Sequence, residues 1–125
     1  MTSAKSSTEE KLMRYHISTL IFIKDRNARF LLLQRVKSPN LGKWSPVGGK
    51  LKMDLGESPF ECAIRETREE SGLELSEDDL HLFACITEKN YEGDGHWLLF
   101  LFACRKTLCG IPADSVEGRF SFFTR

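Results

Sequence analysis

The sequence predicts an α+β fold in which one amphipathic helix packs against a mixed β-sheet. Strand-like runs rich in β-branched and aromatic residues lie on both sides of a single, strongly marked helix. The order of the elements is three strands, a helix and three strands, which favours a mixed sheet with the helix against it. A chain of 125 residues with 41% hydrophobic residues has the size and composition of one globular domain.

The first third of the chain reads as a polar tail followed by strands. Residues 1–12 are rich in Ser and Thr and form the expected tail, so we place the single domain at residues 13–125. Residues 15–24 and 30–35 are strand-like, and the turn-forming residues 25–27 between them predict a hairpin. A short apolar segment at residues 44–47 ends at Gly48 and Gly49, and a loop follows at residues 50–57.

The helix is predicted from its capping residues. Ser58 is suited to the N-cap, Pro59 to the first helical position, and Glu61 completes a capping box. Gly72 is suited to the C-terminal end. The sequence therefore predicts a helix at about residues 59–71.

The rest of the chain predicts a short helical turn and three more strands. The turn is expected at residues 76–80, and residues 82–91 and 96–105 form a hairpin across the Gly-containing residues 92–95. A last strand is expected at residues 119–123. We find no internal repeat.

Composition and charge argue against some classes of binding partner and some cellular locations. The 18 basic and 18 acidic residues give a net charge of zero, which argues against binding to long nucleic acids. No apolar run is long enough to cross a membrane, and the N-terminus lacks the apolar core of a secretory signal, so we expect a cytoplasmic protein. The four cysteines form no C-x-x-C pair and are expected to be reduced thiols that act as small hydrophobes.

Three glutamates lie on one face of the predicted helix. Glu69 and Glu70 follow Glu66 by three and four residues. At these two spacings on a helix, like charges repel by roughly 0.2–0.5 kcal/mol per pair. A solvated surface helix is the alternative, supported by the favourable spacing of Glu61 and Arg65. A hard divalent cation explains the concentration of carboxylates better, because Mg²⁺ prefers oxygen ligands.

The segment from Gly49 to Leu73 resembles the signature of the Nudix (MutT-like) hydrolases. That signature is Gly, five residues, Glu, seven residues, Arg-Glu, an aliphatic residue, any residue, Glu-Glu, any residue, Gly and an aliphatic residue. Its fixed positions after the first glycine are matched here at the right spacing by Glu57, Arg65, Glu66, Glu69, Glu70 and Gly72. The flanking sequences LLLQR and WSPVGGK are also similar to the family.

The match has three departures. Seven residues, instead of five, separate Gly49 from Glu57, which we interpret as an insertion in the loop. Thr67 stands where the family has an aliphatic residue. The family usually ends with a C-terminal helix, which we expect to be absent from this chain or to lie beyond it.

The resemblance implies an α/β/α sandwich with a mixed sheet and a catalytic helix at about residues 59–71. It also implies a Mg²⁺-dependent hydrolase, with Mn²⁺ as a substitute, that cleaves nucleoside diphosphates linked to another group. Glu66 and Glu70 would be the leading metal ligands, with a backbone carbonyl of Gly49. Glu69 would be a third ligand or the base, Glu57 would ligate or orient its neighbours, and Arg65 would hold a signature glutamate by a bidentate ion pair.

Residues outside the signature complete the predicted site. Arg35 and Lys50 are expected to contact substrate phosphate, with ordinary surface charges as the alternative. The family often recruits one more acid from a later loop, and Glu117 is the first candidate. Three other acids are alternatives, namely Glu88, Glu92 and Asp94. Trp44 and Trp97 could stack on a base, although strand aromatics are more often core residues.

The leading hypothesis is a pyrophosphohydrolase of a small nucleotide, most simply a (d)NTP. The alternative substrates are a nucleotide sugar, a dinucleoside polyphosphate or an RNA 5′ end. The alternative class is a non-catalytic nucleotide-binding module on the same fold. Exposed sheet edges could also pair two copies into a homodimer.

Overall fold

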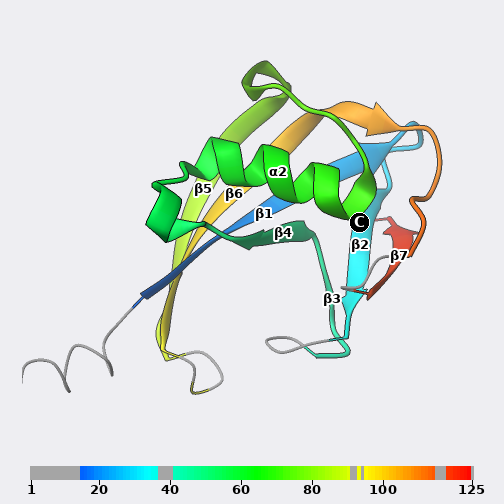
Figure 1. The fold of residues 1–125 in the computed structure, drawn as a ribbon. Helices are drawn as coiled ribbons and strands as arrows, with labels where there is room; N and C mark the ends of the chain where they lie inside the picture. Colours follow the sequence, from blue (N-terminus) through cyan, green and yellow to red (C-terminus); the bar gives the residue numbers. More distant parts are fainter. Residues whose placement is uncertain (1–14, 37–40, 91–92, 94, 115–117, 125) are drawn as a thin grey trace, which may run out of the picture.

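A long central strand, β1 (Tyr15–Asp25), organises a seven-stranded mixed sheet (Figure 1). The computed structural model describes residues 15–36, 41–90, 93, 95–114 and 118–124. The other elements, in chain order, are β2 (Phe30–Arg35), β3 (Trp44–Ser45), β4 (Val47–Lys50), η1 (Met53–Leu55), α2 (Pro59–Ser71), η2 (Glu77–Asp79), β5 (Leu80–Glu88), β6 (His96–Leu108) and β7 (Gly118–Phe123).

The sheet is mixed because β1 pairs in both directions. Its partner on one side, β6, is parallel, whereas β2 and β4 on the other side are antiparallel. The strand order is β3-β2-β1-β6-β5, with β4 added to β1 and β7 added to β2. Alternate residues of β1, Thr19, Ile21 and Ile23, are fully buried, as expected for a strand with one face on the core.

The predicted hairpin of β1 and β2 is confirmed at its turn, but its ladder is short. The Asp25 carboxylate accepts hydrogen bonds from the backbone N–H groups of Asn27 and Arg29, at 3.0 and 2.9 Å, and so closes the turn. Only Lys24 and Phe30 are paired between the described strands. The reason is that β4 takes over the same edge of β1, while all six residues of β2 pair with β7.

The helix has the predicted ends. The Ser58 hydroxyl accepts from the Glu61 N–H at 3.1 Å, and the Ser58 N–H donates to the Glu61 carboxylate at 2.8 Å, which completes the capping box. Gly72 ends α2 in a left-handed conformation with φ of 78°. The expected mixed sheet with this helix against it is confirmed.

The strand predicted at residues 82–91 begins and ends earlier in the structure, where β5 is Leu80–Glu88. β5 begins at Leu80, because this side chain is 4% exposed and belongs to the core. It ends before Asn90, whose φ of 52° interrupts an extended chain. The predicted helical turn at residues 76–80 is the 3₁₀ turn η2.

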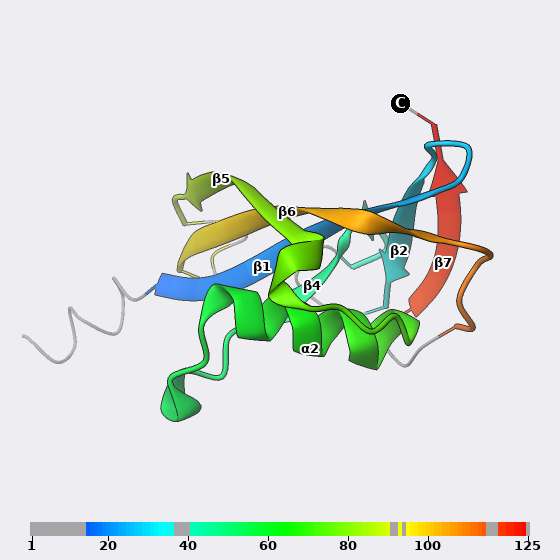
Figure 2. The ribbon, with the colours of Figure 1, turned by 90° about the horizontal axis from the view of Figure 1, so that it is seen from above.

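The α2 helix packs on β1 and β4, on one side of the sheet (Figure 2). Phe60 of the helix meets Phe102 of β6 edge to face, with ring centroids 4.9 Å apart. Within the described ranges α2 is the one α-helix, and it forms a helical layer of the expected α/β/α sandwich. No helix in this part of the chain combines the length and hydropathy needed to span a membrane.

Candidate active site

Arg65 lies at the centre of a cluster of carboxylates on α2 and in the loop before it. Its guanidinium contacts Glu57 at 2.7 and 2.9 Å, Glu66 at 2.9 Å and Glu69 at 3.2 Å. It also donates to the Lys50 carbonyl at 3.1 Å, which ties the helix to the end of β4. One side chain therefore joins the loop, the strand and the helix.

The signature glutamate that Arg65 contacts in a bidentate way is Glu57. The Arg65 side chain is 14% exposed and that of Glu57 is 10% exposed. The hydrogen bond from Arg65, followed by one from the Lys52 N–H, lowers the pKa of Glu57 to about 2. The alternative pairing of Arg65 with Glu61 is not made, because Glu61 caps the helix with Ser58.

Glu66 lies directly against the backbone of Gly49. A Cβ atom placed on Gly49 would overlap with the Glu66 carboxylate. Any other residue at position 49 would therefore displace this carboxylate from its present place between α2 and β4. The glycine also brings together the two parts of the site that the sequence separates by a long loop.

Two buried side chains donate hydrogen bonds to the Gly49 carbonyl oxygen. Thr19 Oγ1 and Cys62 Sγ each lie 3.4 Å from this oxygen and 3.5 Å from each other. Burial raises the pKa of the Cys62 thiol to about 11, so this cysteine is a neutral donor rather than a thiolate. Cys62 behaves as the expected small buried thiol, whereas Cys85 and Cys109 are exposed.

The three glutamates of the helix differ in exposure. The side chain of Glu69 is 50% exposed, that of Glu66 is 16% exposed, and Glu70 as a residue is 8% exposed. Glu66 and Glu69 are drawn towards Arg65, and no three acidic, His or Cys side chains of the described residues converge into a ready metal cage. The cluster nevertheless keeps a net formal charge of −2, because it contains three carboxylates, those of Glu57, Glu66 and Glu69, and one guanidinium.

This arrangement suits a hard divalent cation. All of its anionic donors are carboxylate oxygens, which is the ligand type that Mg²⁺ prefers. The space above Gly49, which a Cβ would fill, is the place where the Glu66 carboxylate meets the strand backbone. The residues present therefore fit the divalent metal that the signature implies.

The predicted substrate-binding residues lie on other elements. Arg35 is the last residue of β2. Lys50 ends β4, with its ammonium 5.3 Å from the centre of the Trp97 ring. Glu117 and two of its alternatives, Glu92 and Asp94, lie outside the described residues, so their roles stay predictions.

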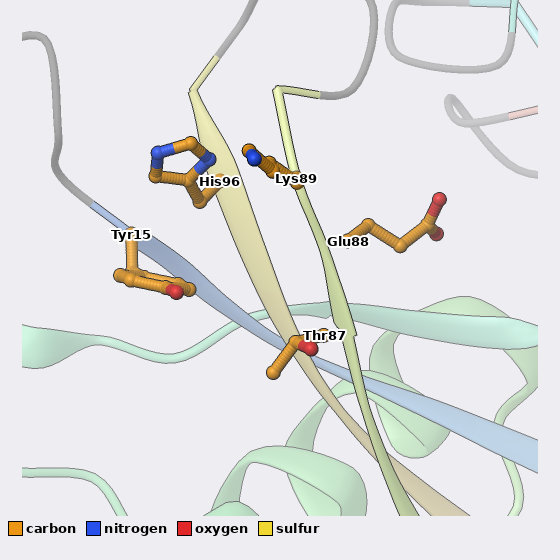
Figure 3. A pocket seen from close by; sticks show the side chains of 5 residues that line it. All are labelled: Tyr15, Thr87, Glu88, Lys89 and His96. Carbon is orange, nitrogen blue, oxygen red and sulfur yellow. The ribbon is translucent and has the colours of Figure 1, made fainter.

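A small pocket of about 300 Å³ lies where β5 ends and β6 begins, beside the first residue of β1 (Figure 3). Its lining residues are Tyr15, Thr87, Glu88, Lys89 and His96. The Tyr15 and His96 rings are 5.3 Å apart, and His96 Nδ1 accepts from the Asn90 N–H. None of these residues belongs to α2 or β4, so the pocket is separate from the Arg65 cluster.

The sequence pointed to Arg65 and the glutamates but not to Thr19 or Cys62. Thr19 is 30 residues from Gly49 in the chain, and it reaches this glycine only through the pairing of β1 with β4. The two-residue spacing of Thr19 from Ile17 and Ile21 could have placed it on the same face of a strand as these isoleucines. It could not have identified Gly49 as its partner.

Comparison with known proteins agrees with this geometry. The model of the NUDIX domain matches residues 14–121. The chain belongs to the Nudix family. Among solved structures, it is similar to the MutT protein from Methanosarcina mazei Go1, with a TM-score of 0.76 and 25% identity over 90% of this chain and 78% of that one.

Two curated relatives of this Nudix chain carry enzyme names. One is the dihydroneopterin triphosphate diphosphatase of Haemophilus influenzae, 38% identical over 76 residues, which are 61% of this chain and 45% of the relative. The other is the RNA pyrophosphohydrolase of Erythrobacter litoralis, 35% identical over 71 residues, which are 56% of this chain and 42% of the relative. The matched segment thus spans less than half the length of each.

Proposed function

We propose that this Nudix chain is a Mg²⁺-dependent hydrolase that cleaves the diphosphate linkage of a nucleoside diphosphate derivative, with a (d)NTP as the favoured substrate. The observation that carries the proposal is the contact of the Glu66 carboxylate with the Gly49 backbone, beneath the Arg65 cluster. A surface helix would not need a glycine at that position. A site that binds a cation and a phosphate would need a glycine there, because the backbone must come close to the ligands.

Glu66 and Glu70 are the residues that would hold the metal, and Glu69 is a third candidate. When bound, a divalent cation neutralises phosphate oxygens and lowers the pKa of a bound water. The Gly49 carbonyl was our other candidate ligand, and its two donors, Thr19 and Cys62, fix its direction. Its part in metal binding stays a prediction.

The side chains of this chain would divide the remaining work. Arg65 holds Glu57 in its ionised form and aligns Glu66 and Glu69 on one side of the helix. Glu69 is half exposed, so water can reach its carboxylate, and it is our candidate for the base that takes a proton from the attacking water. Glu57 is held too acidic for that role, since its pKa is about 2.

The substrate would be a compact triphosphate or a diphosphate derivative. Arg35, Lys50 and Glu117 are our proposed contacts outside the signature. The two curated relatives are named for dihydroneopterin triphosphate and for RNA, and both names describe enzymes that act on phosphate linkages. The net charge of zero favours the small substrate over a long RNA.

A substrate panel tests the proposal. Phosphate and pyrophosphate release would be measured with dNTPs, an oxidised dGTP, dihydroneopterin triphosphate, a nucleotide sugar, a dinucleoside polyphosphate and a 5′-triphosphorylated RNA, each with Mg²⁺ and with EDTA. We expect turnover only with Mg²⁺, and a loss of about 10²-fold or more in Glu69→Gln. The matched control is Glu74→Gln, an exposed glutamate beyond the helix, which should behave like the wild type.

The same panel separates the enzyme from a binding module. A chain that binds nucleotides in a calorimeter but turns over none of them would favour the non-catalytic module. Turnover that persists in EDTA would contradict a metal-dependent reaction at these glutamates.

A further inference from the structure

The edge strand β5 exposes large apolar side chains. It is the last strand in the order β3-β2-β1-β6-β5 and pairs with β6 only, among the strands described. Leu82 is 39% exposed, Phe83 is 49% exposed and Ile86 is 42% exposed. An edge of this kind presents unpaired backbone groups beside apolar side chains, and proteins usually protect it.

The exposure follows from the position of the helix. α2 packs mainly on β1 and β4, whereas β5 is the edge strand beyond β6. The usual protective residues are also missing, because β5 contains no Lys and no Pro. Its protection is limited to a β-bulge between Leu82 and Ala84 and to one charged residue, Glu88, at its end.

The bulge determines which side chains share a face of β5. Leu82 pairs with Phe102, whose ring meets α2, so Leu82 is on the helix side of the sheet. Cys85 and Thr87 are on the same side, since they pair with Phe100 and Leu98 at alternate positions of β6. The other side carries His81, Phe83, Ala84, Ile86 and Glu88.

We propose that β5 pairs with β5 of a second copy of this chain, antiparallel and about a two-fold axis at Cys85. If the bulged residues Phe83 and Ala84 count as one position, every cross-strand pair then joins side chains on the same face. The pairs are His81 with Glu88, Leu82 with Thr87, Phe83 and Ala84 with Ile86, and Cys85 with Cys85, each across the two copies.

Charge complementarity within β5 favours a second copy as the partner. The polar ends of the strand are His81 and Glu88, and this register places each imidazole opposite a carboxylate of the other copy, twice per dimer. The register centred on the bulge would leave Glu88 unpaired. The register centred on Ile86 would place Glu88 opposite Ala84, and a shift by one residue would mix the two faces.

The first test is the mass of the particle in solution. A strand-to-strand interface is small, so we expect a monomer–dimer equilibrium with a Kd on the order of 10 μM in sedimentation velocity. Ile86→Lys should weaken association at least ~10-fold because it introduces two lysines at the interface. Its matched control is Ile111→Lys, since Ile111 is 55% exposed and lies outside β5, and this variant should associate like the wild type.

A charge swap tests the register. His81→Glu should weaken the dimer at least ~10-fold, because it places carboxylates opposite Glu88. The double variant His81→Glu with Glu88→His should restore association to within ~3-fold of the wild type. Failure of the double variant to recover would overturn this register, and a wild-type chain that stays monomeric at high concentration would overturn the proposal.

Oxidation with copper–phenanthroline gives an independent readout. Opposite residues of antiparallel strands have Cα atoms about 5 Å apart, which is within the range of a disulfide. We expect a disulfide-linked dimer through Cys85, absent in Cys85→Ser and retained in Cys109→Ser, which removes the other exposed thiol. Linkage that depends on Cys109 instead would contradict the pairing of β5.

Discussion

Replacing Arg65 with methionine removes the cation that joins Glu57, Glu66 and Glu69. Methionine retains an unbranched side chain, so the change deletes mainly the charge and its hydrogen bonds. The Glu57 side chain is 10% exposed, and Glu66 is 16% exposed, so both carboxylates would lose their partner in a place that water reaches only in part. We expect a destabilised fold at neutral pH.

The size of the effect follows from the pKa of Glu57. A decrease from 4.5 to about 2 corresponds to ~3 kcal/mol between the charged and neutral carboxyl groups. The pair lies near the protein surface, where solvent weakens it, so we expect a loss of about 2 kcal/mol in the free energy of unfolding. That loss is a substantial part of a typical domain stability of ~5–15 kcal/mol.

The pH dependence gives the signature of this mechanism. Because the pKa of Glu57 is lower in the folded state, its contribution is fully present above about 4.5 and is lost as the pH falls towards about 2. The difference between the wild type and Arg65→Met should therefore fall to less than half between pH 7 and pH 3. Urea denaturation followed by circular dichroism at the two pH values measures it.

The matched control is Arg68→Met, an exposed arginine three residues further along the same helix. It should change the free energy of unfolding by less than ~0.5 kcal/mol at both pH values. The reasoning fails if Arg65→Met costs no more than this control at pH 7, or if its cost is the same at pH 3.

Three further predictions follow from the packing around the cluster. Gly49→Ala should cost only ~1 kcal/mol of stability, because the flexible Glu66 side chain can move, but it should lower turnover by displacing that carboxylate; Gly48→Ala, whose Cβ would meet the Thr19 backbone, should cost several times more in the same urea melts. Ser58→Ala removes the capping box of α2 and should cost ~1 kcal/mol by thermal denaturation, whereas an equal loss in Ser121→Ala, outside the helix, would argue against the cap as the cause. In a timed reaction with iodoacetamide, Cys85 and Cys109 should be alkylated in the native protein well before Cys62, since Cys62 is fully buried and its thiol has a pKa of about 11; equal rates by mass spectrometry would contradict the buried, neutral thiol.

The helix could be predicted to the residue because its end signals are local. Ser58, Pro59 and Gly72 act within one turn of the ends of α2, so neighbouring residues contain the information. The limits of β5 could not be predicted as well. They depend on the burial of Leu80 in a core formed by distant strands and on the left-handed backbone of Asn90.

The candidate site also has one part that local sequence predicts and another that depends on the assembled fold. The carboxylates and Arg65 lie in one segment of the sequence, so their spacing predicted an acidic helix face, and the family resemblance implied the bidentate pair of Arg65 with a signature glutamate. Thr19 and Cys62 meet at Gly49 only because β1, β4 and α2 are assembled in three dimensions. Likewise, the spacing of Glu61 and Arg65 suggested an ion pair, but in the structure the Glu61 carboxylate accepts the hydrogen bond from the Ser58 N–H at the N-terminal cap.

A Mg²⁺ titration of nucleotide hydrolysis by the wild type and by Glu66→Gln tests the central claim most directly. The best substrate of the panel would be held at a saturating concentration, with Glu74→Gln as the matched control. We predict no turnover in EDTA, a saturable rise with Mg²⁺ in the wild type and in Glu74→Gln, and a loss of about 10²-fold or more in Glu66→Gln. Equal turnover by Glu66→Gln and the wild type, at every Mg²⁺ concentration, would contradict the assignment of the site.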